Sequence, residues 1–78
     1  MTERYPWHYH PNSDETFIGI EGTVIIETAN ELFELTPGNV ITIPKGVRHC
    51  TRPKGEQSKN LTVERADIET VTNSGEIL

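Results

Sequence analysis

The chain has 78 residues, of which 7 are Lys or Arg and 12 are Asp or Glu, so its formal net charge is −5 at pH 7. Its basic residues form no block or stripe and no apolar run approaches the about 20 residues of a membrane helix, which excludes nucleic acid and membrane as expected partners. Without a recognisable signal segment, and with Cys50 as its single cysteine, it is predicted to be a soluble, cytoplasmic protein.

Short runs rich in β-branched and aromatic residues, separated by Gly, Pro and Asn, predict an all-β sandwich or barrel in one domain, residues 1–78. The stretch 28–35 could form two helical turns, but Thr28 and Pro37 bracket it and a hairpin is preferred. The tail, 66–78, lacks a clear period and is expected to be loosely held. The strands are predicted within 15–22, 23–28, 31–35, 39–43 and 60–65, with Phe33, Leu35, Val40, Ile41, Ile43 and Val47 in the core.

Two of the chain's three histidines, His8 and His10, lie one residue apart in WHYH. On a strand their side chains would share one face, with Trp7 and Tyr9 on the other, and the two rings could converge on one ion. The turn residues PNSD could then return Glu15 beside them. Imidazole nitrogen with one carboxylate suits Zn, Fe, Mn, Ni or Cu better than Ca or Mg. The pair by itself fits ordinary surface or core histidines equally well.

The third histidine, His49, is the last residue of the stretch GNVITIPKGVRH. In this stretch a Gly, a Pro-x-Gly turn and the histidine follow one another at set spacings. The matching residues are His8, His10, Glu15 and Gly22 in a first motif, residues 8–22, and Gly38, Pro44, Gly46 and His49 in a second, residues 38–49. In both motifs the chain resembles a small single-domain cupin. The glycines are expected at turns that need backbone freedom, and Pro44 with Gly46 is expected to turn the chain so that His49 points inward.

The resemblance implies a cupin-type barrel, a jelly roll or double-stranded β-helix, that holds a divalent transition metal (Fe, Mn, Ni, Zn or Cu). The metal ligands would be His8, His10, Glu15 and His49. On the faces of these ligands, Phe17, Gly19 and Thr51 are further candidates to line a pocket, whereas Cys50 is expected to be a small buried hydrophobe.

The chain departs from the cupin pattern in three places. Thr2 stands where the first motif usually opens with Gly, and Pro53 stands where the second usually closes with Asn. Only seven residues precede His8, so the barrel is expected to lack opening strands and to leave an edge unpaired. The prediction is a homodimer that covers this edge, with Trp7 and Tyr9 at the interface unless they cap the chain's own core.

Three functions remain open from the sequence. The first is a metal-dependent enzyme of dioxygenase, isomerase or decarboxylase type acting on a small organic molecule, although no further residue is clearly placed as a general base. The second is a non-catalytic cupin that binds or senses a small ligand at its metal. The third is a metal that mainly stabilises a small core.

Overall fold

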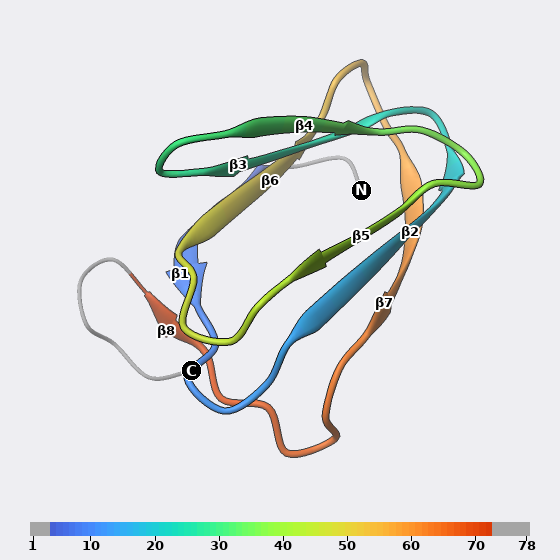
Figure 1. Ribbon diagram of the computed structural model, residues 1–78. Coiled ribbons are helices and arrows are strands. Elements are labelled where there is room, and N and C mark those ends of the chain that lie inside the picture. Colours follow the sequence, from blue (N-terminus) through green and yellow to red (C-terminus); the bar gives the residue numbers. More distant parts are fainter. Residues whose placement is uncertain (1–3, 73–78) are drawn as a thin grey trace.

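A computed structural model describes residues 4–72, which form eight β-strands and no helix (Figure 1). Each predicted run produced a strand, and 28–35 forms the preferred hairpin rather than a helix. The strands are β1 (Tyr5–Tyr9), β2 (Glu15–Glu21), β3 (Val24–Thr28), β4 (Leu32–Leu35), β5 (Val40–Ile43), β6 (His49–Pro53), β7 (Lys59–Val63) and β8 (Val71–Thr72).

The strands build two antiparallel sheets, one in the order β4-β3-β6-β1-β8 and the other in the order β5-β2-β7. Strands far apart in sequence are neighbours: β6 lies between β3 and β1, and β2 lies between β5 and β7. Figure 1 shows the two sheets facing each other across the interior. The predicted all-β architecture is therefore confirmed.

The apolar core lies between the sheets at the inward-facing positions of β2, β3, β4 and β5. The alternation of side chains along each strand selects these positions, because every second residue points to the same face. Ile26 and Leu35 are completely buried, as the burial pattern of a half-buried sheet requires. The buried cluster is Phe17, Val24, Ile26, Leu35 and Ile43, with Phe33, Ile41 and Val47 packed partly against it.

Val40 was wrongly predicted to be in the core, because 60% of it is exposed. It pairs with Ile18 of β2, and its inward neighbours on β5 are Ile41 and Ile43. The error follows from the apolar run NVITI, in which both faces of one strand carry apolar residues and the period does not reveal which face is buried.

The part of the tail that the structure describes, 66–72, contains one short strand. Val71 and Thr72 form β8, which pairs antiparallel with Tyr9 and His8 of β1. β8 thus covers the His8–Tyr9 part of the β1 edge that was expected to be exposed. Residues 73–78 and Thr2 lie outside the described residues.

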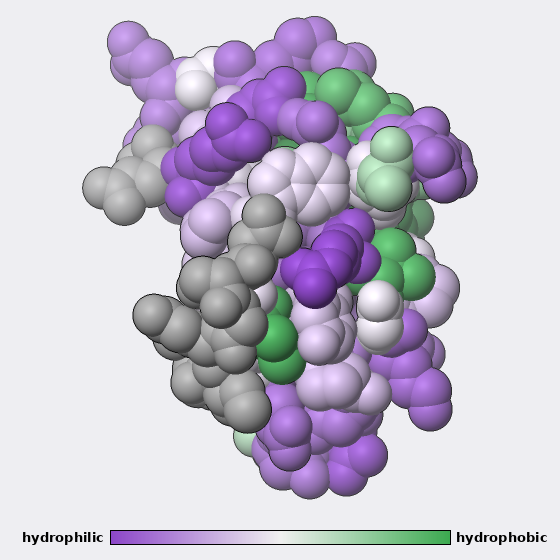
Figure 2. All heavy atoms as spheres, turned by 90° about the vertical axis from the view of Figure 1, so that its left-hand side faces the viewer, coloured by the Kyte–Doolittle hydropathy of each residue, from purple (hydrophilic) through white to green (hydrophobic). Residues whose placement is uncertain are grey.

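The face on which β1 and β8 lie is mostly hydrophilic, with small separated apolar areas (Figure 2). Trp7 and Tyr9 are half-buried in the single chain, and the guanidinium carbon of Arg48 lies 4.8 Å from the centre of the Tyr9 ring. Between residues 4 and 72 no helix is long and apolar enough to cross a membrane.

Candidate metal centre

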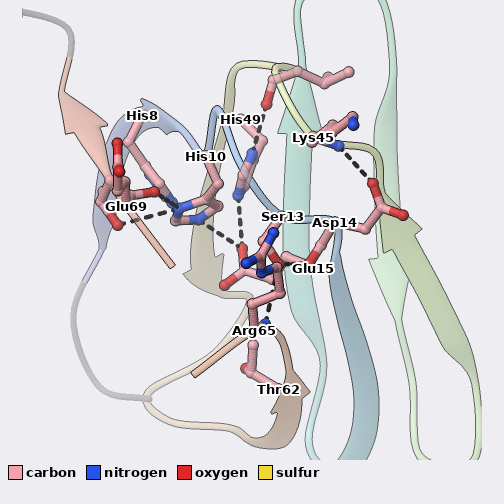
Figure 3. A network of polar contacts seen from close by, with 12 residues as sticks. His8, His10, Ser13, Asp14, Glu15, Lys45, His49, Thr62, Arg65 and Glu69 are labelled. Atoms are coloured by element: carbon pink, nitrogen blue, oxygen red, sulfur yellow. Dashed lines mark hydrogen bonds and ion pairs between the residues drawn. The ribbon is translucent and has the colours of Figure 1, made fainter. Parts of the chain in front are cut away.

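The side chains of His8, His10, Glu15 and His49 gather at one end of the interior, and all four are buried. His8 lies in β1, and His10 is the first residue after that strand. Glu15 is the first residue of β2, and His49 is the first residue of β6. One possible ligand atom from each residue lies within 4.8 Å of the others. Figure 3 shows His10 and His49 pointing at the carboxylate of Glu15, with His8 beside them. The structure therefore brings together the residues that the sequence proposed as ligands.

The three imidazole rings are oriented by backbone carbonyl groups. The Nδ1 atom of His8 lies 2.6 Å from the carbonyl oxygen of Pro6, and that of His49 lies 2.9 Å from the carbonyl oxygen of Val47. Because a carbonyl oxygen only accepts, each Nδ1 carries the proton and donates it. Each Nε2 atom then faces inward, where it could bind a metal ion in place of a proton; carbonyl groups orient the rings of metal-ligating histidines in this way.

His10 is anchored in the same way, but by a distant part of the chain. Its Nδ1 donates to the carbonyl oxygen of Glu69 at 2.9 Å, and the hydroxyl oxygen of Thr70 lies 3.1 Å from the same nitrogen. Its Nε2 lies 3.2 Å from Oε1 of Glu15, while Nε2 of His49 lies 2.9 Å from that oxygen. One carboxylate oxygen thus faces two imidazole nitrogens.

Electrostatics favour an ionised Glu15 and a neutral His8 at this centre. Burial alone raises the pKa of Glu15, but hydrogen bonds from His49 and Glu64 and the nearby charge of His10 outweigh burial, so its pKa is lowered. The pKa of His8 is lowered chiefly by burial, against the opposing effect of its bond to Pro6. Both shifts favour the protonation states that bind metal ions.

Two hydrogen bonds join the turn after β1 to the turn before β6. The backbone N–H of Gly46 donates to the carbonyl oxygen of His10 at 2.8 Å, and that of Lys45 donates to Oδ1 of Asp14 at 2.8 Å. Gly46 has φ +82°, a left-handed conformation that glycine adopts at low cost. The Pro-x-Gly turn therefore fixes the first motif against the second.

A family model described as a cupin domain matches residues 2–63. The chain belongs to the cupin family. The uncharacterized protein YdbB of Bacillus subtilis is 42% identical over 72 residues, which are 91% of this cupin and 63% of that protein. Polyketide synthase CurC of Streptomyces cyaneus is 27% identical over 75 residues, which are 96% of this chain and 49% of that protein. This cupin thus spans less than two-thirds of the length of the curated relatives it matches.

Solved structures agree with the family assignment. A cupin-2 domain protein of Shewanella frigidimarina is 30% identical, with a TM-score of 0.65 over 82% of this chain and 59% of that chain. The DMSP lyase DddQ of Ruegeria pomeroyi is 27% identical, with a TM-score of 0.78 over 95% of this chain and 39% of that chain. The described architecture is therefore that of a cupin domain within longer relatives.

A pocket of about 360 Å³ opens beside the histidine and glutamate cluster of this cupin. Thr51 and Phe17 line it, as expected, and Phe17 also contacts the edge of His49 with ring centres 6.2 Å apart. Gly19 does not line it, because it packs against the backbone of Thr36, where a side chain would collide. The lining residues are Tyr5, His8, His10, Glu15, Phe17, Thr51, Asn60, Thr62, Glu64, Ile68 and Thr70.

Sequence reasoning missed Glu64 and the segment that follows it. Glu64, an exposed residue, lines the pocket beside Glu15, and partial desolvation together with Glu15 raises its pKa. Asn12 holds the segment by accepting from the N–H of Glu69 at 2.9 Å and donating to the carbonyl oxygen of Asp67 at 3.0 Å. No spacing rule joins Asn12 to residues 55 or more positions away, so only the tertiary structure reveals this support.

Proposed function

We propose that this cupin binds one divalent transition-metal ion (Fe, Mn, Ni, Zn or Cu) through His8, His10, Glu15 and His49, and that a small organic molecule binds beside the ion. The observation that carries the proposal is the shared orientation of the imidazoles, whose Nδ1 atoms bond to carbonyl oxygens while their Nε2 atoms converge. Such outer bonds accompany metal-ligating histidines and raise their basicity.

The donor set fits an ion of this kind. Around a metal with bonds of about 2.0–2.2 Å, neighbouring donor atoms lie about 3 Å apart and opposite ones about 4.2 Å apart. The four possible donor atoms lie within 4.8 Å of one another, close to that range, and all come from buried residues. Nitrogen donors with one carboxylate favour the transition metals over Ca or Mg.

We further propose that the protein is a metal-dependent enzyme of dioxygenase, isomerase or decarboxylase type. A bound ion would supply Lewis acidity or a binding place for O₂ at its open positions. The chain would supply the rest: Phe17 and Ile68 exclude water from part of the pocket, and Glu64 offers a carboxyl group that can hold a proton. The alternative is a binding or sensing cupin with the same ion and pocket but no turnover.

A matched pair of variants tests the metal site. Glu15→Gln removes the carboxylate charge within the cluster, whereas Glu21→Gln makes the same change at the exposed end of the same strand. Metal content and Ni²⁺ affinity, measured by elemental analysis and calorimetry, are expected to fall strongly in the first variant and to match the wild type in the second. Equal uptake by all three proteins would refute the assignment.

A second experiment separates enzyme from binding module. The metal-loaded protein is assayed for O₂ uptake against phenols, diketones and thiols, and for conversion of sugars and small acids by NMR. Turnover that disappears with chelation and returns with metal supports the enzyme. Saturable binding of a compound that is never converted supports the sensing alternative.

We also propose that the protein is a homodimer, with the outer face of the β5-β2-β7 sheet as its interface. Ile18 of β2 is flanked there by Val40 and Leu61 of the neighbouring strands, and these two are 60% and 57% exposed. Apolar patches of this kind mark association surfaces, and a stable interface buries about 800 Å² on each partner. This face replaces the half-buried Trp7 and Tyr9 as the expected interface.

Light scattering after size exclusion tests the homodimer. Leu61→Lys places a charge in the proposed interface, and Leu32→Lys makes the same change at an equally exposed leucine on β4, in the other sheet. Two chains per particle are expected for the wild type and for Leu32→Lys, and one chain for Leu61→Lys. A wild-type monomer at micromolar concentration would end the proposal.

A further inference from the structure

A second pocket, of about 400 Å³, is lined by residues of the edge strands β4 and β5. β4 is the last strand of one sheet and β5 is the last strand of the other (Figure 1). Residues of the hairpin turn 28–31 and of the segment 44–48 complete the walls. Among the described residues, none lines both this pocket and the one beside the histidines. We call the second pocket the edge pocket.

The floor of the edge pocket is apolar. Phe33 lies opposite Ile26 in the pairing of β3 with β4, so both side chains point into the sandwich. Ile43, at the end of β5, belongs to the buried core cluster, and Val47 packs partly against that cluster. Phe33, Ile43 and Val47 all line the edge pocket. A hollow of this size with an apolar lining and a few polar groups is the usual form of a small-molecule site.

Two exposed residues of opposite charge, Glu31 and Arg48, also line the edge pocket. Glu31 is bonded twice to Thr28: its N–H donates to the Thr28 hydroxyl at 3.2 Å, and its carbonyl oxygen accepts from the Thr28 N–H at 2.9 Å. Thr28 in turn pairs with His49 across β3 and β6, and Arg48 directly precedes His49. The fold therefore brings an anionic and a cationic residue to the rim of one pocket.

The guanidinium group of Arg48 lies over an aromatic ring. Its carbon is 4.8 Å from the centre of the Tyr9 ring, a distance at which a cation and a ring attract each other. An arginine over a ring can still donate from the edge of its planar group, and the spacing of those donors matches a carboxylate. Arg48 is thus suited to a carboxylate, and Glu31 is suited to an ammonium group.

We propose that the edge pocket binds an apolar α-amino acid, with its side chain on the floor, its carboxylate at Arg48 and its ammonium group at Glu31. An apolar acid or an apolar amine would match only one of the two rim charges and would face repulsion from the other. An amino acid with an apolar side chain matches both charges and the floor. The inference does not rest on the proposed function, because none of the four candidate metal ligands lines the edge pocket.

The test uses leucine and three analogues that each lack one of its features. Leucinamide lacks the carboxylate, isocaproate lacks the ammonium group, and glycine lacks the apolar side chain. Each is titrated into the isotope-labelled protein as purified, at physiological salt, while NMR follows the backbone amide signals. Glycine binds free metal ions through the same groups as leucine, so it also controls for metal removal.

Leucine is expected to shift the amide signals of residues 28–31 and 42–48 in a saturable manner. It should bind up to about fivefold more tightly than leucinamide or isocaproate, which is the discrimination that one exposed ion pair supplies. Glycine should show no saturable shift. Absence of leucine binding, equal binding of leucine and glycine, or shifts confined to the pocket beside the histidines would overturn the inference.

Two variants assign the two charges. Arg48→Gln is expected to remove the preference for leucine over leucinamide and to keep the preference over isocaproate, and Glu31→Gln is expected to do the reverse. The matched controls Arg4→Gln and Glu56→Gln change exposed residues outside the edge pocket and should keep both preferences. The amide spectra show that each variant is folded. Both preferences unchanged in Arg48→Gln and Glu31→Gln would refute the assigned contacts.

Discussion

The interior of this cupin has two regions that differ in chemistry although they share the same two sheets. At one end Val24, Ile26 and Leu35 are almost completely buried among apolar neighbours. At the other end three histidines and Glu15 are also buried, and each makes hydrogen bonds. Phe17 belongs to both regions, since it lies in the apolar cluster and lines the pocket.

The difference indicates that the apolar region stabilises the fold and that the polar region is the candidate functional site. Burial of apolar side chains contributes about 25 cal/mol for each Å² removed from water, whereas buried polar groups cost free energy unless they are fully bonded. A domain of this size has little stability to spare. A polar cluster in so small an interior costs stability, and the proposed metal site would account for it.

The apolar region is expected to give the largest effect. Leu35→Ala leaves a cavity in the cluster and should lower the free energy of unfolding by about 2–5 kcal/mol. Leu32→Ala, at the exposed start of the same strand, should change it by less than about 0.5 kcal/mol. Urea unfolding followed by fluorescence measures both; equal losses in the two variants would show that the core is misplaced.

Substitutions in the polar region are expected to change metal binding more than the stability of the metal-free fold. His49→Ala should abolish metal uptake, a loss greater than the about 10–100-fold that follows mutation of outer-shell residues. Chelation should lower the melting temperature of the wild type, because the ion binds only the folded state, but not that of His49→Ala. Leu35→Ala, where it still folds, should retain the metal. Full metal content in His49→Ala would remove the distinction between the two regions.

Residues 65–70 support the polar region from outside, because the carbonyl group of Glu69 orients His10. Asn12→Ala breaks both bonds to this segment and should weaken metal binding by about tenfold through the displaced carbonyl partner of His10. Asn30→Ala, in the exposed turn between β3 and β4, is the control and should have no effect. Calorimetric Ni²⁺ titrations compare them, and equal affinities would mean that the segment does not support the site.

The smallest effect concerns pH. Because burial lowers the pKa of His8 below its ordinary 6.5, the unfolded chain binds the proton more readily than the folded one in that window. The stability of the metal-free protein should therefore fall as pH drops from about 6.5 through the lowered pKa. His8→Gln should flatten this dependence, as measured by urea midpoints in chelator. The lowered pKa of Glu15 acts in a separate window, below 4.5.

Much of the candidate site was predictable because its residues are short-range features of the chain. Period-two alternation placed His8 and His10 on one face, and the glycine and proline spacing predicted the turn before His49. The same reasoning misplaced Val40 and did not reveal that residues 67–69 contact the site. Apolar residues on both faces of β5 hide the direction of burial, and the bonds of Asn12 to Asp67 and Glu69 depend on a loop closure that no local pattern encodes.

The sequence by itself indicated the strands and the turns, because backbone freedom and side-chain alternation act over a few residues, and its resemblance to the two cupin motifs named the four polar residues. The tertiary structure alone decided that the strands of the second half flank those of the first, so that a carbonyl group of the tail orients His10 and β7 provides the opposite wall. Those arrangements arise from burying two apolar faces against each other, a long-range effect that depends on the whole chain at once.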